Sequence, residues 1–428
     1  MKRLLAALIG AFALAPAAAT PPPLSVVYVH AGHVIEPSTG QMLDNQLIRV
    51  TDGYVTAVEP WHEPPQGANV VDWSRQWVLP GLIDCHVHLA DFLQTSDPAE
   101  PLKHSAEETA YAGARNARAT LEAGFTTVHD VGSYRANGNI ELRNAINRGD
   151  VVGPRINAVG GYITVPGGGG EVTGLPAGMV VPPEMRMGVA KTPAEVHRKV
   201  NVMLDLGADS IKLIATGAVL TEGTEPGQIE LDGPSVLAAV QTARARGSWV
   251  TSHAHGAQGI MQAIIAGSRG IEHASLIDDA GIILAKNQGT YLDMDVYNGD
   301  YIAEVGRRDG WSANILRKND ETTEAQRQAF AKAVKAGVKL PFGTDAGVFP
   351  HGLNARQFKY MVKYGMTPLQ AIQSATTVAA EFLMWNKRVG SLTPGHWGDM
   401  IAVGSSPLED ISVLERVEHV MKGGVVVR

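Results

Sequence analysis

The chain has 428 residues and a formal net charge of −7, and its composition excludes several classes of protein. Hydrophobic residues make up 45% and charged residues 18%, which allows a large core and excludes wholesale disorder. Because there is no long basic run, we do not expect nucleic acid as a partner. The single cysteine, Cys85, excludes an internal disulfide. The length suits two or three domains, although one α/β barrel can absorb about 250 residues by itself.

The first segment is predicted to be a targeting signal and not part of the fold. Basic residues at the start precede an apolar run at 4–14, and alanines at 17–19 offer a cleavage site. A membrane anchor is disfavoured, because the run is shorter than about 20 residues and is followed by Pro16. We therefore expect residues 1–19 to be a signal peptide that is cleaved near Ala19. The mature protein would be exported, periplasmic or secreted, with no membrane partner.

Both ends of the mature chain have the alternating pattern of β-structure. Residues 24–79 contain apolar runs separated by turn residues, and the C-terminal residues 386–428 contain similar runs. Two β-rich ends of one chain can build a single small domain together. We expect 24–79 and 386–428 to form a β-sandwich domain.

The middle of the chain, residues 80–385, alternates short apolar strands with helices. Ser105, Thr192 and Thr367 each begin a helix with a capping pattern. Eight alternations over about 300 residues predict an α/β fold with a TIM-type (β/α)8 barrel. The expected strands end near His88, Asp130, Gly160, Ile214, His255, Ser275, Asp295 and Asp345.

Polar residues recur where these parallel strands should meet their loops, which is where barrel enzymes carry out chemistry. Side chains alternate along a strand, so His86 and His88 face the same way and can hold one metal ion. An isolated His-x-His would be weak evidence, but four further strand ends carry polar groups of the same kind. These are Lys212, His253 with His255, Glu272 with His273, and Asp345.

Lys212 needs its own chemical explanation, because an ammonium group cannot bind a metal. Its alternative role is that of a salt-bridge residue inside the barrel. A desolvated lysine surrounded by cations loses its proton readily. The free amine can then add carbon dioxide, and the resulting carbamate has two oxygens that can bridge two metals.

These motifs together resemble the metal-dependent amidohydrolase superfamily over nearly the whole mature chain. The segments around Lys212, His253 and Asp345 are most similar to its Xaa-Pro dipeptidases and carboxypeptidase-like members. The closing segment 390–403 is also similar to that of the family. His129 departs from the pattern, because relatives often carry Arg at that position, and this leaves its role open.

The resemblance implies a set of roles for the residues at the strand ends. His86 and His88 would bind the more buried metal with Asp345, while His253 and His273 would bind a second. Carboxylated Lys212 would bridge the two divalent ions, for which zinc is expected. The implied substrates are small-molecule amides, namely N-acyl amino acids, dipeptides or ochratoxin A, from which phenylalanine is released. The family also suggests assembly into a homo-oligomer.

For four features outside this ligand set, the sequence allows more than one role. His255 would lie nearer the mouth and contact a substrate carboxylate, or would support a ligand from behind. His351 would contact substrate, or would be a surface loop residue. Cys85 is expected to be a buried inert thiol and not a nucleophile. The loop 167–170 would be a lid over the mouth or a plain flexible loop.

The expected reaction is amide hydrolysis by a hydroxide that bridges the two metals. Asp345 would take the proton of the attacking water and pass it to the leaving amine. No Gly-x-Ser-x-Gly motif supplies a covalent route. One rival is a deaminase or cyclic-amide hydrolase with a single metal on the same fold. A second rival, an exported binding protein without catalysis, is disfavoured by the complete ligand set.

Overall fold

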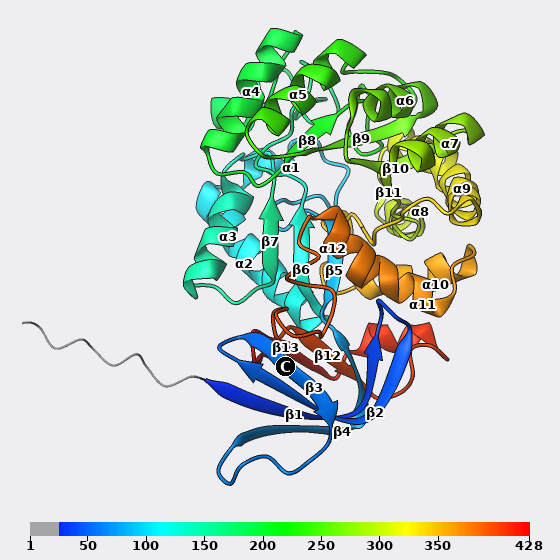
Figure 1. The fold of residues 1–428 in the computed structure, drawn as a ribbon. Helices are drawn as coiled ribbons and strands as arrows, with labels where there is room; N and C mark the ends of the chain where they lie inside the picture. The colour runs from blue at the N-terminus through cyan, green and yellow to red at the C-terminus, as the bar shows by residue number, and fades with distance from the viewer. Residues whose placement is uncertain (1–24) are drawn as a thin grey trace, which may run out of the picture.

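The computed structural model describes residues 25–428, and the predicted signal peptide lies outside this range. Two regions follow from the sequence pattern. The chain ends build one sheet, and the segment between them builds parallel strands surrounded by helices (Figure 1). Within 25–428, no helix combines the length and the apolar character needed to cross a membrane.

Seven strands from both ends of the chain form the terminal sheet, in the order β14-β13-β12-β4-β1-β2-β3. The pairing gives one sheet and not the two facing sheets of the expected sandwich. A register shift between Ala31 and His33 bends β1 against β4, as a bulge does. The strands are β1 (Val26–Glu36), β2 (Gln41–Thr51), β3 (Tyr54–Pro60), β4 (Asn69–Pro80), β12 (Met400–Val403), β13 (His419–Lys422) and β14 (Val425–Val426).

The terminal sheet has its own hydrophobic core, which is built from alternating positions of its strands. Val27, Val29 and Ala31 of β1 are buried, and they belong to one cluster with Val78 of β4 and Met400 of β12. Every second residue of a strand faces the same side, so the alternation in the sequence becomes one apolar face. Residues more than 300 positions apart in the sequence therefore pack in one hydrophobic cluster.

The central region contains two parallel sheets, one of three strands and one of four. The three-stranded sheet has the order β5-β6-β7, and the four-stranded sheet has the order β11-β10-β9-β8. Nearly every residue of these strands is buried, as expected for strands covered on both faces. The strands are β5 (Leu82–Val87), β6 (Phe125–Asp130), β7 (Arg155–Ala158), β8 (Ile211–Ile214), β9 (Val250–Gly256), β10 (Gly270–Leu276) and β11 (Tyr291–Asp293).

The eighth expected strand, ending at Asp345, forms no regular ladder in the described chain. Its segment 339–346 makes single backbone hydrogen bonds instead. The carbonyl of Lys339 accepts from Leu292 of β11, and that of Phe342 accepts from Cys85 of β5. The backbone turns at Asp345, whose φ of 62° is incompatible with an extended strand. The segment thus connects the edges of the two sheets without forming a continuous ladder.

A second connection between the sheets lies beside β7 and β8. The carbonyl of Ala158 accepts from Asp209, and the segment at Ile163 pairs with Leu213 in a parallel bridge.

β4 ends at Pro80 and leads through Gly81 into β5, so the terminal sheet lies at the amino ends of the parallel strands. A side chain at position 81 would overlap Thr126, since a Cβ there would lie 2.0 Å from its Oγ1.

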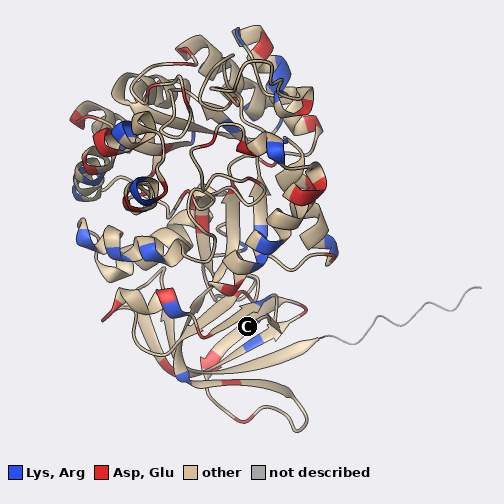
Figure 2. Cartoon of the chain, turned by 180° about the vertical axis from the view of Figure 1, so that it is seen from behind, with Lys and Arg blue, Asp and Glu red and all other residues tan. Residues whose placement is uncertain are grey.

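Helices surround the parallel strands, and several begin where their capping residues predict. Ser105 and Thr367 form reciprocal capping boxes. Thr192 caps only one way, because Glu195 accepts from Lys191 instead. Figure 2 shows basic and acidic residues on the outer helices. The helices are α1 (Glu100–Lys103), α2 (Ala106–Glu122), α3 (Gly138–Arg148), α4 (Pro193–Asp205), α5 (Gly233–Ala245), α6 (Ala257–Ala266), α7 (Asp279–Gln288), α8 (Asn298–Asp309), α9 (Ala313–Ala336), α10 (Gln357–Lys363), α11 (Pro368–Gln373) and α12 (Ala379–Phe382).

Candidate active site

A pocket lies at the carboxyl ends of the parallel strands, on the side away from the terminal sheet. It brings together all six residues that the sequence predicted as metal ligands, together with His255. The carboxyl ends of parallel strands meet at one rim, so residues distant in sequence converge there. The converging residues are His86 on β5 and His88 just after it, Lys212 on β8, His253 and His255 on β9, His273 on β10, and Asp345.

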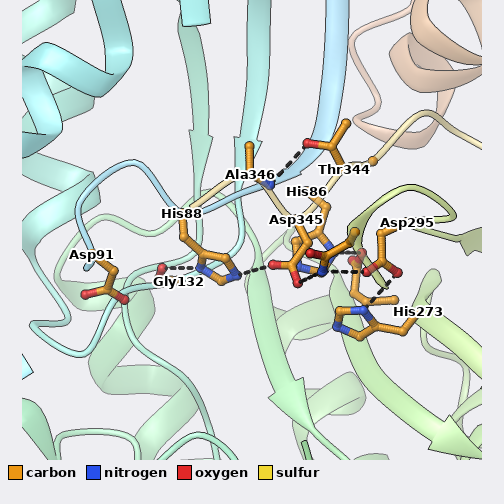
Figure 3. A network of polar contacts seen from close by, with 12 residues as sticks. His86, His88, Asp91, Gly132, His273, Asp295, Thr344, Asp345 and Ala346 are labelled. Atoms are coloured by element: carbon orange, nitrogen blue, oxygen red, sulfur yellow. Dashed lines mark hydrogen bonds and ion pairs between the residues drawn. The ribbon is translucent and has the colours of Figure 1, made fainter. Parts of the chain in front are cut away.

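Asp345 lies between the two histidines of β5 and its loop. Its Oδ1 lies 3.4 Å from Nε2 of His86 and 3.3 Å from Nε2 of His88 (Figure 3). His86 and Asp345 also form, with His273, a group whose potential ligand atoms all lie within 4.8 Å of one another. All are buried. His86, His273 and Asp345 thus bring three potential ligand atoms close to one position.

A second group contains His253, His255 and His273, whose potential ligand atoms also lie within 4.8 Å of one another. The rings of His255 and His273 stack with centroids 4.7 Å apart. His273 thus belongs to both groups and links them. The ring centroid of His253 lies 4.5 Å from that of His273, so both histidines of β9 lie next to His273.

Each of these histidines has one ring nitrogen held by a neighbour, which leaves the other nitrogen available. Nδ1 of His88 lies 2.9 Å from the Gly132 carbonyl, and Nδ1 of His273 lies 3.0 Å from Asp295. A carbonyl or carboxylate accepts the ring proton, so Nε2 keeps its lone pair for a metal. The remaining contacts are His253 Nε2 to Gly217 O at 3.3 Å and His255 Nδ1 to Ser275 Oγ at 2.9 Å.

His86 lies next to a carboxylate of β10, that of Glu272. Nδ1 of His86 lies 2.9 Å from Oε2 of Glu272, although the two groups are not aligned for a hydrogen bond. Burial holds the pKa of His86 well below its usual value, with the charge of Lys212 acting in the same direction. A neutral imidazole is the form that binds metals.

Lys212 is buried at the same rim, and its Nζ has no hydrogen-bond partner. Burial lowers the pKa of Lys212, while the carboxylates of Glu272 and Asp345 act in the opposite direction. A buried lysine normally uses its three donors, so an unpartnered amine is costly. Lys212 is thus a buried amine without a hydrogen-bond partner, beside the histidines and Asp345 that line the same pocket.

Three residues that sequence reasoning missed connect the two groups. Nδ2 of Asn298 donates to Asp345 at 2.9 Å and to Asp295 at 3.1 Å. Gln326 donates to Asp295 at 2.7 Å and to the carbonyl of His273 at 3.0 Å. Asp295 follows β11 at a strand end, which is the signal that could have identified it. Asn298 and Gln326 lie on helices α8 and α9 and carry no comparable signal.

Two further histidines lie outside the pocket lining. Nε2 of His351 lies 3.2 Å from the carbonyl of His88, and its Nδ1 lies 3.2 Å from Thr120. His351 thus supports the backbone beside a predicted ligand, and we do not assign it a substrate contact. His129 lies between the carbonyl of Cys85 and the hydroxyl of Ser210, and burial lowers its pKa to about 4.

Cys85 is buried in an apolar cluster with Trp249 and Phe382. Burial raises the pKa of its thiol well above the usual value, with the charge of Asp293 acting in the same direction. Since the thiolate is the nucleophilic form, burial and the raised pKa both disfavour Cys85 as a nucleophile.

The glycine-rich loop 167–170 borders the pocket and is held by carboxylates. The N–H of Gly169 donates to both oxygens of Glu230, at 3.0 and 2.8 Å. A Cβ at Gly168 would lie 2.5 Å from the same carboxylate. The glycines therefore allow close approach of the backbone to Glu230, and the loop is anchored in this structure.

The backbone is strained at two of the converging residues. His273 has a φ of 69° and Asp345 a φ of 62°, which is the left-handed region that favours glycine. Such conformations cost of order 1–3 kcal/mol each and occur mainly where the surroundings enforce them for function. The strain turns both side chains toward the same pocket.

One side of the pocket is apolar. It is lined by Leu93, Leu220, Ile302 and Val348, which belong to or pack against one hydrophobic cluster. The histidines and Asp345 line the same pocket. A substrate therefore meets both reactive groups and an apolar surface, the usual combination in small-molecule sites.

Residues 77–427 match the Amidohydrolase family, and the chain belongs to that family. It is similar to the ochratoxinase of Aspergillus niger, with 31% identity over 424 aligned residues, covering 93% of this chain and 86% of the relative. The resemblance inferred from the strand-end motifs is thus confirmed.

Solved structures give the same result. A Xaa-Pro dipeptidase with bound methionine in its active site has 36% identity and a TM-score of 0.88, covering 94% of this chain and all of the other. The A. niger ochratoxinase structure has 28% identity and a TM-score of 0.82, covering 95% and 96% of the two chains.

Proposed function

We propose that this protein is a binuclear metal amidohydrolase that cleaves the amide bond of an N-acyl amino acid, a dipeptide or ochratoxin A, releasing phenylalanine from the last of these. The observation that carries the proposal is the buried, unpartnered Nζ of Lys212 in a pocket that also holds the predicted histidine and aspartate ligands. A simple structural role would give that amine a partner.

The donor set suits two divalent ions, for which we propose zinc. His86, His88 and Asp345 would hold one, and His253 and His273 the other, with Lys212 as a carbamate between them. His88 and His273, whose Nδ1 atoms are each held by a neighbouring carbonyl or carboxylate, support this assignment, because their Nε2 atoms stay available. Imidazole, carboxylate and carbamate donors also suit manganese and cobalt. Bound ions would polarise the amide carbonyl and make water a nucleophile near neutral pH.

The residues of the chain divide the remaining work. Asp345 accepts the proton of the attacking water and delivers it to the leaving amine, a transfer that requires its carboxylate to stay fixed. Asn298 holds Oδ2 of that carboxylate, leaving Oδ1 toward the histidines. Ser275 can donate to Nδ1 of His255, which would leave the His255 proton on Nε2 for a substrate carboxylate.

The apolar side of the pocket supports a substrate with a bulky apolar group. Leu93, Ile302 and Val348 would contact such a group, while His255 would contact the carboxylate of the amino acid half. The names of the two relatives above refer to a mycotoxin and to dipeptides, and both kinds of substrate contain an amide bond next to an amino acid.

The proposal includes four features of the whole protein. The two parallel sheets and segment 339–346 would form one TIM-type (β/α)8 barrel over residues 80–385, supported by the hydrogen bonds that connect them. Residues 24–79 and 386–428 would form the second domain. The chain would be exported after cleavage near Ala19, and would assemble into a homo-oligomer.

A hydrolysis screen tests the reaction. The metal-loaded protein is incubated with N-acyl amino acids, dipeptides, ochratoxin A, cyclic amides and aminated heterocycles, and released amine or ammonia is measured. Release of an amino acid supports the proposal. Ammonia release or ring opening with one metal per chain would favour the mononuclear deaminase or cyclic-amide hydrolase. No turnover with metals bound would favour a binding protein.

A further inference from the structure

A second lysine, Lys318 on α9, is fully buried close to the active-site pocket. Its Nζ donates to three backbone carbonyls, those of Ala218 at 3.0 Å, Thr221 at 2.7 Å and Thr224 at 3.3 Å. An ammonium group has three donors, so all of them are used. The arrangement is a cage of carbonyl oxygens around a cation supplied by the protein.

The three carbonyls belong to one loop that follows β8 and borders the pocket. Residues 218–221 of this loop line the pocket, including Val219 and Leu220. The helix turn next to Lys318 lines it as well, through Asn319 and Thr322. Lys318 thus joins two walls of the pocket from behind without lining it itself.

Two carboxylates of the same loop fasten it to the start of α9. Glu222 accepts from Asn314 at 2.8 Å and from Ser312, and Glu225 accepts from Arg317 at 2.8 Å. These contacts are only partly buried or exposed, so water can replace them. Among these contacts between the loop and α9, the hydrogen bonds of Lys318 are the buried ones.

Burying an ammonium group without a carboxylate next to it is unfavourable. Packing alone does not require a charged side chain at this position. Desolvation lowers the pKa of Lys318, while Glu222 and Glu225 act in the opposite direction. A methionine of similar length would fill the same space without that cost. The three hydrogen bonds to backbone carbonyls offset this cost, and they form only while the loop keeps the conformation that brings those carbonyls together.

We propose that Lys318 is a positioning residue for substrate specificity: it fixes the loop 217–225 so that Leu220 completes the apolar side of the pocket with Leu93 and Ile302. The specificity part rests on the proposed amide hydrolysis. The positioning part does not, because the loop is held whether or not a substrate is present.

The test uses Lys318→Ala, Lys318→Met and Leu220→Ala, with Lys332→Met on the exposed face of the same helix as the matched control. kcat/KM is measured for N-benzoyl-phenylalanine and for N-acetylglycine. In both Lys318 variants the loop is no longer held. The ratio of kcat/KM for N-benzoyl-phenylalanine to that for N-acetylglycine should therefore fall roughly tenfold, the effect of a lost apolar contact. Leu220→Ala should show a similar loss, and Lys332→Met none.

Chemical rescue separates positioning from general stability. Propylammonium added to Lys318→Ala should occupy the carbonyl cage and restore the preference, whereas it should not act on Lys318→Met. Hydrogen exchange of 217–225 provides a readout without substrate: it should rise in both Lys318 variants and fall again in Lys318→Ala with the amine. If Lys318→Ala folds only when refolded with the amine, that also supports the cage.

Other outcomes overturn the proposal. These are unchanged exchange and preference in both Lys318 variants, equal effects of the amine on Lys318→Ala and Lys318→Met, or a Lys318→Ala chain that stays unfolded with the amine present. If wild type cleaves no amide but the exchange results hold, the proposed function fails while the positioning role stands.

Discussion

The side-chain amide of Asn298 donates a hydrogen bond to Oδ2 of Asp345 at 2.9 Å. The same nitrogen lies 3.1 Å from Asp295, which in turn holds Nδ1 of His273. One amide therefore connects the predicted proton-transfer residue with the histidine shared by both ligand groups. This contact fixes which oxygen of Asp345 faces the other donors.

Replacing Asp345 with asparagine should reduce kcat more than it changes KM. Its proton transfer belongs to the transition state, and such transfers contribute about a hundredfold to ten-thousandfold. Steady-state kinetics on an N-acyl phenylalanine, with metal content measured in parallel, checks this. Asp279→Asn, at an exposed carboxylate, is the control. A rise in KM alone would make Asp345 a substrate contact and require another base.

Asn298→Ala should lower kcat by a smaller amount, about tenfold, because it loosens Asp345 without removing it. If Asn298 acts through Asp345, its substitution should cost little in a chain that already carries Asp345→Asn. A double-mutant cycle on kcat measures this coupling. Strictly additive losses would show that Asn298 acts elsewhere.

The convergence of the predicted ligand residues on one pocket could be predicted from the sequence, because they lie on or next to parallel strands that share one rim. His86, Lys212 and His273 occupy positions whose orientation follows from alternation and from the common rim of parallel strands. Helix starts at Ser105 and Thr367 were predictable for a similarly local reason. Each of these signals is carried by a few neighbouring residues.

The supporting contacts could not be predicted, because they depend on packing between distant segments. Asn298 and Lys318 lie on helices, where polar residues are ordinary, and nothing local shows that they turn inward. The segment before Asp345 has the apolar pattern of a strand, and the sequence predicts one there, but the segment makes only isolated backbone hydrogen bonds with β5 and β11. The pattern reports burial, whereas a ladder requires regular backbone pairing with a neighbouring strand, which the pattern does not encode.

His255→Ala should remove a preference for free carboxylates. In wild type, an N-acyl phenylalanine should react faster than its C-terminal amide, because a charge-assisted hydrogen bond contributes roughly 1.5–3 kcal/mol, about tenfold to a hundredfold in kcat/KM. His351→Ala should keep the preference, since its ring contacts Thr120 and a backbone carbonyl. Equal rates for acid and amide in wild type would reject carboxylate recognition.

Glu230 should make the stability of the glycine-loop region depend on pH. Burial raises the pKa of Glu230 from about 4.5 to about 7 in the folded protein, while Gly169 acts in the opposite direction. The folded state therefore binds more protons than the unfolded state between these values, and the contribution of Glu230 to stability falls as pH rises through this window.

The Glu230→Gln variant tests this dependence, because its side chain does not titrate. As pH rises from 4.5 to 7, the free energy of unfolding of wild type should fall relative to that of Glu230→Gln. Denaturant unfolding at several pH values measures it. A difference that stays constant across the window would contradict the raised pKa.

The most direct test of the two-metal account is the metal content of wild type and Lys212→Ala, measured per chain after identical loading and desalting. We predict two divalent ions in wild type. The variant should lose the second ion and nearly all turnover of an N-acyl phenylalanine, with part of the turnover restored by small carboxylic acids that replace the carbamate. Lys212→Met provides a variant of similar length. Two ions and normal turnover in Lys212→Ala without added acid would contradict the account.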